Sequence, residues 1–347
     1  MSTYVAIMAG GIGSRFWPAS RPTRPKQFLD ILGVGKSLLR LTYERFLPLV
    51  PAERILVVTH AQYRDMVMEH LPELSPAQVL CEPSRNNTGP SVAYTALHLQ
   101  ALDPDANFVM APADHIILRE EQFLAHLRTA LDFTAQEHAI VTLGIRPTRP
   151  DTGYGYIHFG KQKEKNLYQV RRFMEKPVLS IAKRFVESGE YLWNAGIFVW
   201  RAQTILEAYL KHATPIYDIL TKGADVYGTD REQAFIDAVY PTTPRISVDY
   251  AILEKSESIY TIPVDIGWSD LGTWASLHHE CQQDDDGNVK QGGRLLLEDV
   301  SGCMIRMPEK KVVLMRGMKD FIIVDDEDVL LIWPIDAEQH ISPVEGT

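Results

Sequence analysis

The sequence has few cysteines, no long apolar run and no excess of basic residues. Its 347 residues include only Cys81, Cys281 and Cys303, without a Cys-x-x-Cys pair, which argues against a disulfide framework or a zinc cluster and favours a reducing cytoplasm. No stretch is long enough to span a membrane, and the first residues lack a signal-peptide pattern. The net charge of −10 argues against nucleic-acid binding. The composition predicts a globular cytoplasmic protein with no nucleic-acid partner and no membrane partner.

Acidic residues are missing from residues 1–29, although the chain as a whole is acidic. The same segment contains Arg15, Arg21, Arg24 and Lys26. A basic segment on an acidic protein indicates a local anion-binding site rather than a track for a polyanion. A solvated surface loop would show the same composition, so the charge alone leaves both interpretations open.

Short apolar runs alternate with amphipathic patterns in the first half of the chain. The runs resemble buried strands, and the segments between them place apolar residues three and four positions apart, as helices do. Strands are predicted at Tyr4–Ala9, Ile55–Thr59, Val79–Cys81, Phe108–Ala111 and Ile140–Leu143, and helices at Ser37–Phe46, Gln62–Leu71, Pro90–Leu102 and Glu121–Ala135. This alternation predicts an α/β fold with a mostly parallel sheet, in which ligands bind beyond the carboxyl ends of the strands.

The pattern changes in the second half of the chain. Hairpin-like strands are expected within Gly153–Glu175, and helices follow near Leu179–Ser188, Ala202–Ala213 and Arg231–Val239. The acidic stretch at 284–288 is typical of a linker, and short β-runs without a helical period come after it. We therefore predict a large domain with the functional site at residues 1–284 and a small β-domain at residues 289–337.

A glycine-rich loop follows the first predicted strand. Glycines at positions 10, 11 and 13 let the backbone approach a phosphate closely and turn its N–H groups toward it. The loop is not a dinucleotide fingerprint, since Phe16 stands at the third glycine position, and it lacks the Gly-Lys-Ser/Thr of a Walker loop. The glycines alone are compatible with a tight turn of no function. Together with Arg15 and Pro25-Lys26-Gln27 they form a far more specific motif.

This motif, at residues 10–28, resembles the signature of the sugar-nucleotide pyrophosphorylases, and its WPASR and PKQF segments resemble the mannose-1-phosphate guanylyltransferase branch of that family. Ser14, Phe16 and Ala19 stand where threonine, leucine and leucine are common in the family, but the glycines and the two cations are kept. The resemblance continues through EPSRNNTGPS, APADH, TGYGYI, MEKP, WNAGIF, SVDYAILEK and GWSDLGTW, so it spans nearly the whole chain.

The resemblance implies an enzyme that makes GDP-mannose and pyrophosphate from GTP and mannose 1-phosphate, with Mg²⁺ as cofactor. It also implies a Rossmann-like sheet, a C-terminal β-domain similar to a left-handed β-helix, and a homodimer. The catalytic cations by resemblance are Arg15, Lys26 and Lys176. The nucleotide is expected at Met8, Ala9, Gly10, Gly11, Gly13, Glu82, Asn87, Gly89, Pro112 and Asp114. The sugar phosphate is expected at Gly155, Tyr156, Glu175, Lys176, Asn194 and Asp249, and the metal at Asp114 and Asp270.

Several of these residues also have a simpler interpretation. Asp114 and Asp270 each precede a helical stretch and would serve as N-caps, although Mg²⁺ on a triphosphate typically uses one or two protein carboxylates. Glu175 and Lys176 would form an ordinary surface ion pair. His115 is a poor ligand for a hard cation, and the pair at 278–279 is typical of a surface.

The implied reaction is in-line attack by the sugar phosphate on the α-phosphorus of GTP. A phosphate monoester loses its second proton near pH ~6, so no general base is required and catalysis rests on positioning and charge neutralisation. A nicotinamide dehydrogenase shares the strand–helix pattern but not the fingerprint. A non-catalytic nucleotide-sugar sensor of the same fold, or an enzyme for another hexose 1-phosphate or nucleotide, stays open. Some family members also isomerise mannose 6-phosphate in a further domain; no His-rich cupin-like segment follows the β-runs here, so a single activity is expected.

Glu82 is the candidate for base choice, because it directly follows the third predicted strand. Guanine presents N1–H and the 2-amino group as donors, whereas adenine has an acceptor at N1. An ionised carboxylate accepts both guanine donors, and facing adenine it would be left unsatisfied at a cost of ~1–3 kcal/mol. The alternative is that Glu82 points to solvent and main-chain groups read the base.

Overall fold

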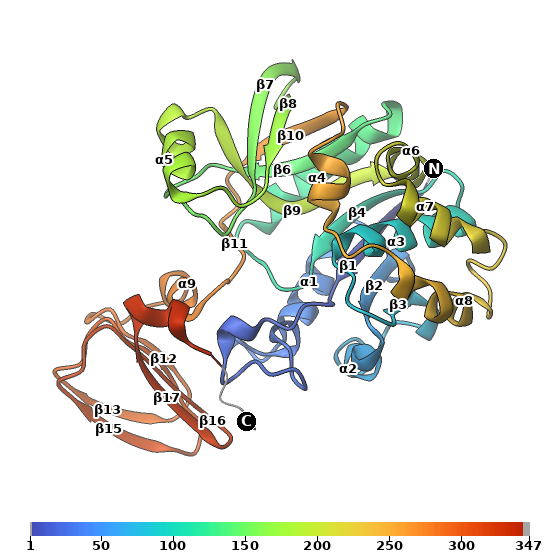
Figure 1. The fold of residues 1–347 in the computed structure, drawn as a ribbon. Helices are drawn as coiled ribbons and strands as arrows, with labels where there is room; N and C mark the ends of the chain where they lie inside the picture. The colour runs from blue at the N-terminus through green and yellow to red at the C-terminus, as the bar shows by residue number, and fades with distance from the viewer. Residues whose placement is uncertain (1, 343–347) are drawn as a thin grey trace. The chain divides into compact units, whose positions relative to one another are not determined.

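The computed structural model describes residues 2–342, which divide into two compact units (Figure 1). Among the described residues, the first unit comprises residues 2–10, 43–112 and 117–268. The second unit comprises residues 11–42, 113–116 and 269–342. The chain passes from one unit to the other within α1 (Leu38–Phe46) and within the short strands β5 (Ile116–Ile117) and β11 (Trp268–Ser269). The second unit therefore combines the segment after the first strand with the C-terminal strands, although these segments are far apart in the sequence.

The first unit is built on a nine-stranded sheet in the order β3-β2-β1-β4-β9-β6-β10-β8-β7. Its strands are β1 (Thr3–Met8), β2 (Ile55–His60), β3 (Val79–Glu82), β4 (Asn107–Pro112), β6 (Ile140–Ile145), β7 (Tyr156–Glu164), β8 (Leu167–Met174), β9 (Tyr191–Arg201) and β10 (Ile259–Val264). The first four strands of the sheet order are parallel, and β9 lies antiparallel between β4 and β6. The predicted α/β class is confirmed.

Helices of this unit surround the sheet (Figure 1). They are α2 (Arg64–His70), α3 (Thr88–Leu102), α4 (Glu120–Gln136), α5 (Leu179–Ser188), α6 (Ala202–His212), α7 (Thr214–Leu220) and α8 (Glu232–Val239). The consecutive residues Val5, Ala6 and Ile7 of β1 are fully buried, which requires cover on both faces of the sheet. None of the helices within residues 2–342 combines the length and apolar character needed to cross a bilayer.

Helix α3 is buried along most of its length, because residues 89–99 are mostly apolar or small on every face, and the one basic side chain among them, His98, is paired with Glu232. It begins at Thr88, two residues before the predicted start. The side chain of Asn87 caps it by accepting a hydrogen bond from Thr88 N, and the first turn of a helix tolerates the proline at position 90.

The second unit contains short strands that stack in parallel. They are β12 (Val289–Gln291), β13 (Arg294–Glu298), β14 (Met304–Arg306), β15 (Val312–Arg316), β16 (Phe321–Asp326) and β17 (Val329–Pro334), with helix α9 (Trp274–Glu280) before them. β12, β14 and β16 pair in parallel, as do β13 and β15, whereas β16 and β17 form an antiparallel hairpin. Parallel stacking of successive short strands is the arrangement of a β-helix; its handedness stays a prediction.

The core of the second unit joins its two distant segments. Phe16 and Trp17 from the N-terminal segment pack in one buried cluster with Trp274 of α9 and with Met304 and Ile322 of the strands. The ring of Phe16 meets that of Trp274 edge-on at 4.9 Å, and Trp274 Nε1 donates to the carbonyl oxygen of Trp17 at 3.1 Å. The loop after β1 is thus part of a packed core.

Candidate functional site

The predicted site residues fall into both units. The first unit holds Met8, Ala9, Gly10, Glu82, Asn87, Gly89, Pro112, Gly155, Tyr156, Glu175, Lys176, Asn194 and Asp249. The second unit holds Gly11, Gly13, Arg15, Lys26, Asp114 and Asp270.

In the second unit, residues 11–28 form what we call the signature loop, which is fixed by its own contacts. Gln27 Nε2 donates a hydrogen bond to the carbonyl oxygen of Gly11 at 2.9 Å. Gly13 has a φ of +68°, and a Cβ at this position would lie 2.4 Å from Cβ of Lys26. Only glycine therefore fits here without strain or displacement of Lys26.

The ammonium of Lys26 lies between two aspartates. The residue is 4% exposed, and its Nζ is 2.9 Å from Oδ2 of Asp114 and donates to the main-chain oxygen of Asp270 at 2.7 Å. Burial alone would raise the pKa of Asp114, but the charge of Lys26, helped by His115, outweighs burial and holds that pKa below its ordinary value. Asp114 is therefore ionised at neutral pH.

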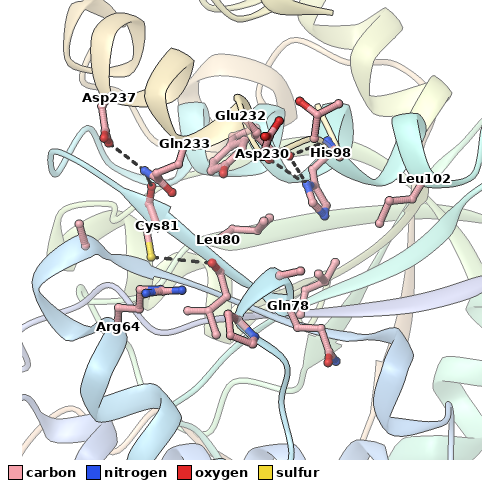
Figure 2. Close-up of a pocket in the computed structure, with 18 of the residues that line it drawn as sticks. Arg64, Gln78, Leu80, Cys81, His98, Leu102, Asp230, Glu232, Gln233 and Asp237 are labelled. Carbon is pink, nitrogen blue, oxygen red and sulfur yellow. Dashed lines mark hydrogen bonds and ion pairs between the residues drawn. The ribbon is translucent and has the colours of Figure 1, made fainter. Parts of the chain in front are cut away.

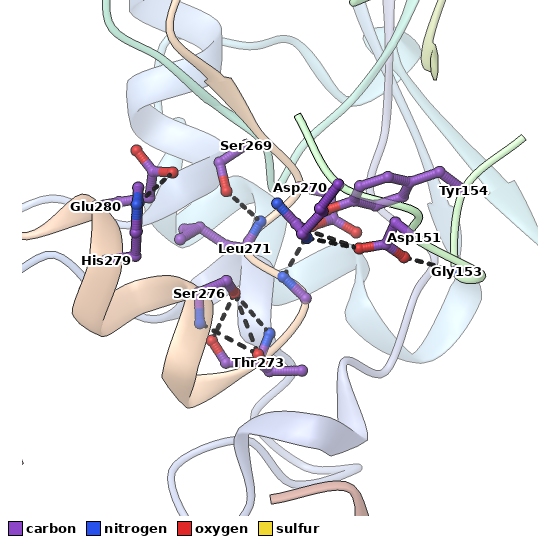
Figure 3. A network of polar contacts seen from close by, with 12 residues as sticks. Asp151, Gly153, Tyr154, Ser269, Asp270, Leu271, Thr273, Ser276, His279 and Glu280 are labelled. Atoms are coloured by element: carbon purple, nitrogen blue, oxygen red, sulfur yellow. Dashed lines mark hydrogen bonds and ion pairs between the residues drawn. The ribbon is translucent and has the colours of Figure 1, made fainter. Parts of the chain in front are cut away.

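Arg15 and the carboxylate of Asp270 border the same small volume. A Cβ at Gly272 would lie 3.3 Å from both carboxylate oxygens of Asp270 and 3.6 Å from Nη1 of Arg15. The N–H of Gly272 donates to Oδ1 of Asp270 at 3.0 Å, within the turn shown in Figure 3. Two cations and two acidic residues of the second unit thus converge.

Neither aspartate is a helix cap. The N-cap of α9 is Thr273, whose side chain accepts from Ser276 N in a capping box (Figure 3). The helix after Asp114 is α4, and its N-cap position is occupied by Arg119. The simpler interpretation of both aspartates is therefore wrong, and their place beside Lys26 needs another explanation.

The carboxylates of Asp114 and Asp270 are a donor set that suits a divalent cation. Within residues 2–342, no three histidine, cysteine, aspartate or glutamate side chains are grouped to hold a metal ion by themselves. Asp114 and Asp270 offer oxygen donors, which hard cations such as Mg²⁺ prefer, with phosphate and water completing the shell. His278 Nε2 contacts the carbonyl oxygen of Gly287 at 2.7 Å, so its role is structural.

The first unit places Glu82 at the carboxyl end of β3. The hydroxyl of Tyr240 donates to its Oε1, and a Cβ at Gly10 would lie 3.3 Å from its Oε2. Burial raises the pKa of Glu82 to about 7, against the opposing effect of the hydrogen bonds from Tyr240 and Ser91. Glu82 is half-buried, and its carboxylate is hydrogen-bonded to Tyr240. Nothing local in the sequence identified Tyr240, which lies 158 positions away.

The turn before α3 has already used some of its main-chain donors. Thr88 N is bonded to the side chain of Asn87 at 2.8 Å, and Gly89 N donates to the carbonyl oxygen of Ile246 at 2.9 Å. A Cβ at Gly89 would lie 2.5 Å from that same oxygen. The glycine is thus required by the close approach of residue 246, and these two N–H groups are not available to a ligand.

Met8, Ala9 and Pro112 lie at the ends of adjacent parallel strands, where Met8 of β1 pairs with Pro112 of β4. The main chain of Ala9 is bonded on both sides: its N donates to Val58 O at 2.8 Å, and its O accepts from Thr59 Oγ1 at 2.9 Å. The backbone here is held rigidly at the sheet edge where the sequence placed a ligand.

A second group in the first unit joins Gly155, Glu175, Asn194 and Asp249. Asn194 Nδ2 donates to Oδ1 of Asp249 at 3.2 Å, and Asn194 N donates to the carbonyl oxygen of Gly155 at 2.8 Å. A Cβ at Gly155 would lie 2.6 Å from Oε2 of Glu175. Four predicted residues, distant in sequence, thus meet at one place. We call them the polar quartet.

Lys176 and Tyr156 border the polar quartet in different ways. Lys176 Nζ is 3.0 Å from Oε1 of Glu175, but the lysine side chain is 59% exposed and that of the glutamate only 10%. The pair is therefore anchored by a buried carboxylate and differs from an ordinary surface ion pair. Tyr156 is fully buried and its hydroxyl donates to Asp151 O at 2.8 Å, so its side chain is structural.

Asp249 opens a single π-helical turn, Asp249–Leu253, and such turns are frequent at functional sites. Burial, and then the charge of Glu175, raise its pKa to about 6. An ionised Asp249 is therefore unfavourable for the fold.

Replacing Asp249 by asparagine is expected to raise the midpoint of thermal unfolding at pH 8. The folded pKa, about 6, lies above the value of about 4 in the unfolded chain, so the folded state binds the proton more tightly and stability falls as pH rises through this interval. One pKa unit is worth about 1.4 kcal/mol, so the cost at pH 8 is up to about 3 kcal/mol. Melting curves at pH 8 and pH 5 should show a larger gain at pH 8; equal gains would contradict the assignment.

A separate cavity of about 740 Å³ lies beside β3 (Figure 2). It is lined by Leu80 and Cys81 of β3, His98 of α3, and Glu232 and Gln233 of α8. Nδ1 of His98 is 2.8 and 2.9 Å from the two carboxylate oxygens of Glu232, and both residues are buried. None of the predicted site residues lines this cavity, and no sequence pattern indicated it.

Comparisons with known proteins extend over nearly the whole chain. The profile of the nucleotidyl transferase family matches residues 4–287. The mannose-1-phosphate guanylyltransferase of Escherichia coli (strain K12) is 35% identical over 350 residues, covering 98% of this chain and 72% of the relative. The xanthan biosynthesis protein XanB of Xanthomonas campestris pv. campestris (strain B100) is 35% identical over 341 residues, covering 97% and 71%. A crystal structure described as a mannose-1-phosphate geranyltransferase from Thermus thermophilus has a TM-score of 0.88 at 33% identity, covering 98% of this chain and 97% of that one.

Proposed function

We propose that this chain, which belongs to the nucleotidyl transferase family, joins mannose 1-phosphate to GTP, forming GDP-mannose and releasing pyrophosphate. The observation that carries the proposal is the buried ammonium of Lys26, which contacts the carboxylate of Asp114 and the main-chain oxygen of Asp270. Arg15 lies beside the carboxylate of Asp270. Such a group of charges suits a reaction that brings anionic phosphates together. Relatives named for this activity support the choice of sugar and base.

The reaction is an in-line displacement at the α-phosphorus of GTP. An oxygen of mannose 1-phosphate attacks, the bond from the α-phosphorus to the bridging oxygen breaks, and pyrophosphate leaves. The attacking phosphate is already ionised at neutral pH, since its second pKa lies near ~6, so no side chain has to remove a proton. Arg15 and Lys26 would neutralise the triphosphate and the leaving pyrophosphate, and Lys176 would bind the attacking phosphate.

A divalent cation, proposed to be Mg²⁺, would be held by Asp114 and Asp270. When bound, it supplies positive charge at the α-phosphate and orients its oxygens. The protein's own part is to keep both carboxylates ionised and in place. Lys26 keeps Asp114 ionised by lowering its pKa, and the N–H of Gly272 holds the side chain of Asp270 in place through a hydrogen bond.

The polar quartet would bind the sugar. Buried hydroxyl groups need both donors and acceptors, and the amide of Asn194 with the carboxylates of Glu175 and Asp249 offers both. The main chain at residues 155–156 would contact the sugar from the side. The hydrogen bond from Asn194 to Asp249 fixes the orientation of both side chains, which favours binding of the hydroxyl groups.

In the first unit, the nucleotide would be bound at the carboxyl ends of β1, β3 and β4, near Met8–Gly10, Glu82 and Pro112. In the second unit, Gly11 and Gly13 of the signature loop would contact phosphates. Oε1 of Glu82 accepts a hydrogen bond from Tyr240, which fixes the carboxylate, and Oε2 lies beside Gly10, 3.3 Å from where a Cβ would stand. In the ionised form this carboxylate accepts from N1–H and the 2-amino group of guanine. Asn87 and Gly89 would shape the pocket by their side chain and close packing.

Replacing Glu82 by glutamine is expected to lower the preference for GTP over ATP by roughly tenfold to a hundredfold, matching ~1–3 kcal/mol for an unsatisfied buried group. The amide oxygen can still accept from Tyr240, so the site keeps its shape. Because the pKa of Glu82 is about 7, the preference of the unaltered enzyme should also rise between pH 6 and pH 8. The measurement is kcat/KM for both nucleotides across this range. An unchanged ratio in the variant would show that main-chain groups read the base.

A substrate matrix tests the proposed function. Pyrophosphate release is measured for four nucleoside triphosphates against several sugar 1-phosphates, with and without Mg²⁺. The highest kcat/KM is expected for GTP with mannose 1-phosphate, and none without a divalent cation. If another pair is preferred, the substrate assignment fails. If no pair reacts while nucleotide sugars still bind, the chain is a sensor of the same fold.

We further propose that the chemistry resides in residues 1–284 and that residues 289–337 form a supporting β-domain. The family profile ends at residue 287, near this division. The β-domain would support the signature loop by packing, because the loop and these strands share one buried cluster within the second unit.

A further inference from the structure

Two of the four basic residues within positions 1–29, Arg21 and Arg24, form ion pairs with acidic residues near the end of the chain. Arg21 Nη2 is 2.6 Å from Oδ1 of Asp328, and Arg24 Nη2 is 2.6 Å from Oδ1 of Asp326. Glu327 contacts both arginines, at 3.9 Å from Arg21 Nη1 and 3.3 Å from Arg24 Nη1. The three acidic residues are consecutive: Asp326 ends β16, and Glu327 and Asp328 form the turn to β17. We call these three residues the acidic turn.

Each arginine also binds the signature loop itself. Arg21 Nε donates to the carbonyl oxygen of Pro18 at 3.1 Å, and Arg24 Nη2 donates to that of Ala19 at 3.2 Å. The main chains of Arg21 and Arg24 exchange two hydrogen bonds, of 3.1 and 2.9 Å. The two guanidinium groups therefore tie a small closed turn of the loop to the acidic turn.

A second attachment lies on the other side of Lys26. Arg306 Nη1 of β14 donates to the carbonyl oxygen of Asp30 at 3.0 Å, and Gln291 Nε2 of β12 donates to that of Ile31 at 3.0 Å. Lys26 is two residues after Arg24 and four before Asp30. Lys26 thus lies between two segments, at residues 21–24 and 30–31, that are each bonded to the C-terminal strands.

The degree of burial indicates which of these ion pairs restrict the loop most strongly. The side chains of Arg21 and Asp326 are 12% and 14% exposed, whereas isolated ion pairs in open solvent contribute little. Here five charges form one connected network with partly buried members, and an arginine fork restricts the orientation of its partner. The network is suited to fixing the position of a loop more than to adding stability.

We propose that the acidic turn is a positioning element for catalysis: by holding Arg21 and Arg24 it sets the signature loop so that Lys26 and Arg15 meet the triphosphate. This inference rests on the proposed function. Asp326 and Asp328 are positioning residues, which act through the loop and touch no substrate. Loss of the network frees the loop, and misplacement of a catalytic cation by even ~1 Å lowers the rate steeply.

The test compares two changes in the same hairpin. Asp326→Asn combined with Asp328→Asn removes the two carboxylates closest to the arginines. Asp325→Asn removes the ion pair between Asp325 and Lys311, which does not involve the loop. We expect the double variant to lose about tenfold in kcat/KM for GTP, with the KM for mannose 1-phosphate within about twofold. The Asp325→Asn control should retain the activity of the unaltered enzyme. Equal activity of the double variant and the control would overturn the proposal.

A double-mutant cycle separates positioning from general loss of structure. Arg24→Gln, Asp326→Asn and their combination are compared by kcat/KM for GTP and by melting temperature. If the pair acts as a unit, the combination costs no more than either single change; additive losses in activity that parallel losses in melting temperature would overturn the proposal.

Failure of the proposed function has a different signature. In that case the unaltered enzyme itself releases no pyrophosphate from any substrate pair. The positioning role of the acidic turn is then measured through the binding of GTP, by calorimetry of the same variants. Weaker binding by the double variant than by the Asp325→Asn control supports this role, and equal binding refutes it.

Discussion

Replacing Asp270 by asparagine is expected to lower turnover by about two orders of magnitude or more and to leave the fold intact. Asparagine has nearly the same shape, and its side-chain oxygen can still accept the hydrogen bond that Gly272 N donates to Asp270 at 3.0 Å. The loss is the negative charge beside Arg15, which in the proposal holds the divalent cation. The measurement is kcat with both substrates saturating, over a titration of Mg²⁺.

The matched control is Thr273→Ala, three residues further along. It removes the cap of α9 and should cost about 1 kcal/mol of stability with turnover close to that of the unaltered enzyme. Asp270→Asn should show the reverse pattern, a normal melting temperature with low turnover. Near-normal turnover of the Asp270 variant at limiting Mg²⁺ would refute its role in metal binding.

Replacing Glu232 by alanine is expected to have the largest effect on stability, a loss of about 3–5 kcal/mol. The carboxylate accepts two contacts from His98, at 2.8 and 2.9 Å, and one from Gly228 N at 2.6 Å. All of this lies at the wall of the cavity in Figure 2. Removing the acceptor leaves buried donors without a partner, and their desolvation is then uncompensated.

The pH dependence of this effect has a definite sign. Burial would raise the pKa of Glu232, but the hydrogen bond and charge of His98 outweigh burial and hold that pKa below its ordinary value. A carboxylate with a lowered folded pKa stabilises above its unfolded pKa, and this contribution is lost as pH falls. The difference in free energy of unfolding between the unaltered protein and Glu232→Ala should therefore shrink below about pH 4.

Denaturant unfolding at pH 7 and at lower pH measures both expectations for Glu232. Glu53→Ala is the control, because Glu53 lines the same cavity but is exposed, and it should stay within about 0.5 kcal/mol of the unaltered protein. A Glu232→Ala protein as stable as the control would mean that the His98 contact contributes little.

Much of the first unit was predictable because its signals are local. The segment Ile55–Thr59 became β2 with one more residue, and the helix at Leu179–Ser188 has the predicted ends. Both rely on the spacing of apolar residues, which short stretches carry by themselves. The class of fold followed from the alternation of such stretches.

Strands β9 and β10 were not predicted, although they lie in the middle of the sheet order. The segment Tyr191–Arg201 was interpreted only as a motif, and its place between β4 and β6 depends on partners more than 45 residues away. Pairing of this kind is decided by the assembled sheet, and no periodicity within the strand reveals it.

The candidate site shows the same limit. Charged residues at the carboxyl ends of strands could be selected from the sequence, because parallel sheets bring those ends together. What could not be selected were the groups that fix them: Tyr240 for Glu82, and the acidic turn for Arg21 and Arg24. Each of these groups lies far along the chain from the residue that it contacts, so no local sequence pattern indicates the contact.

The link between the signature loop and the acidic turn has a consequence for the order of synthesis. Arg24 and Asp326 are 302 positions apart, and at about 5–20 residues per second a ribosome needs about 15–60 s to add that many. The loop is thus among the first segments to leave the ribosome and among the last to find its partners. A nascent chain can pair the strands β1–β4 while Arg15 and Lys26 of the signature loop still lack the support of the C-terminal strands. If the acidic turn positions the signature loop as proposed, activity requires translation past the β16–β17 hairpin.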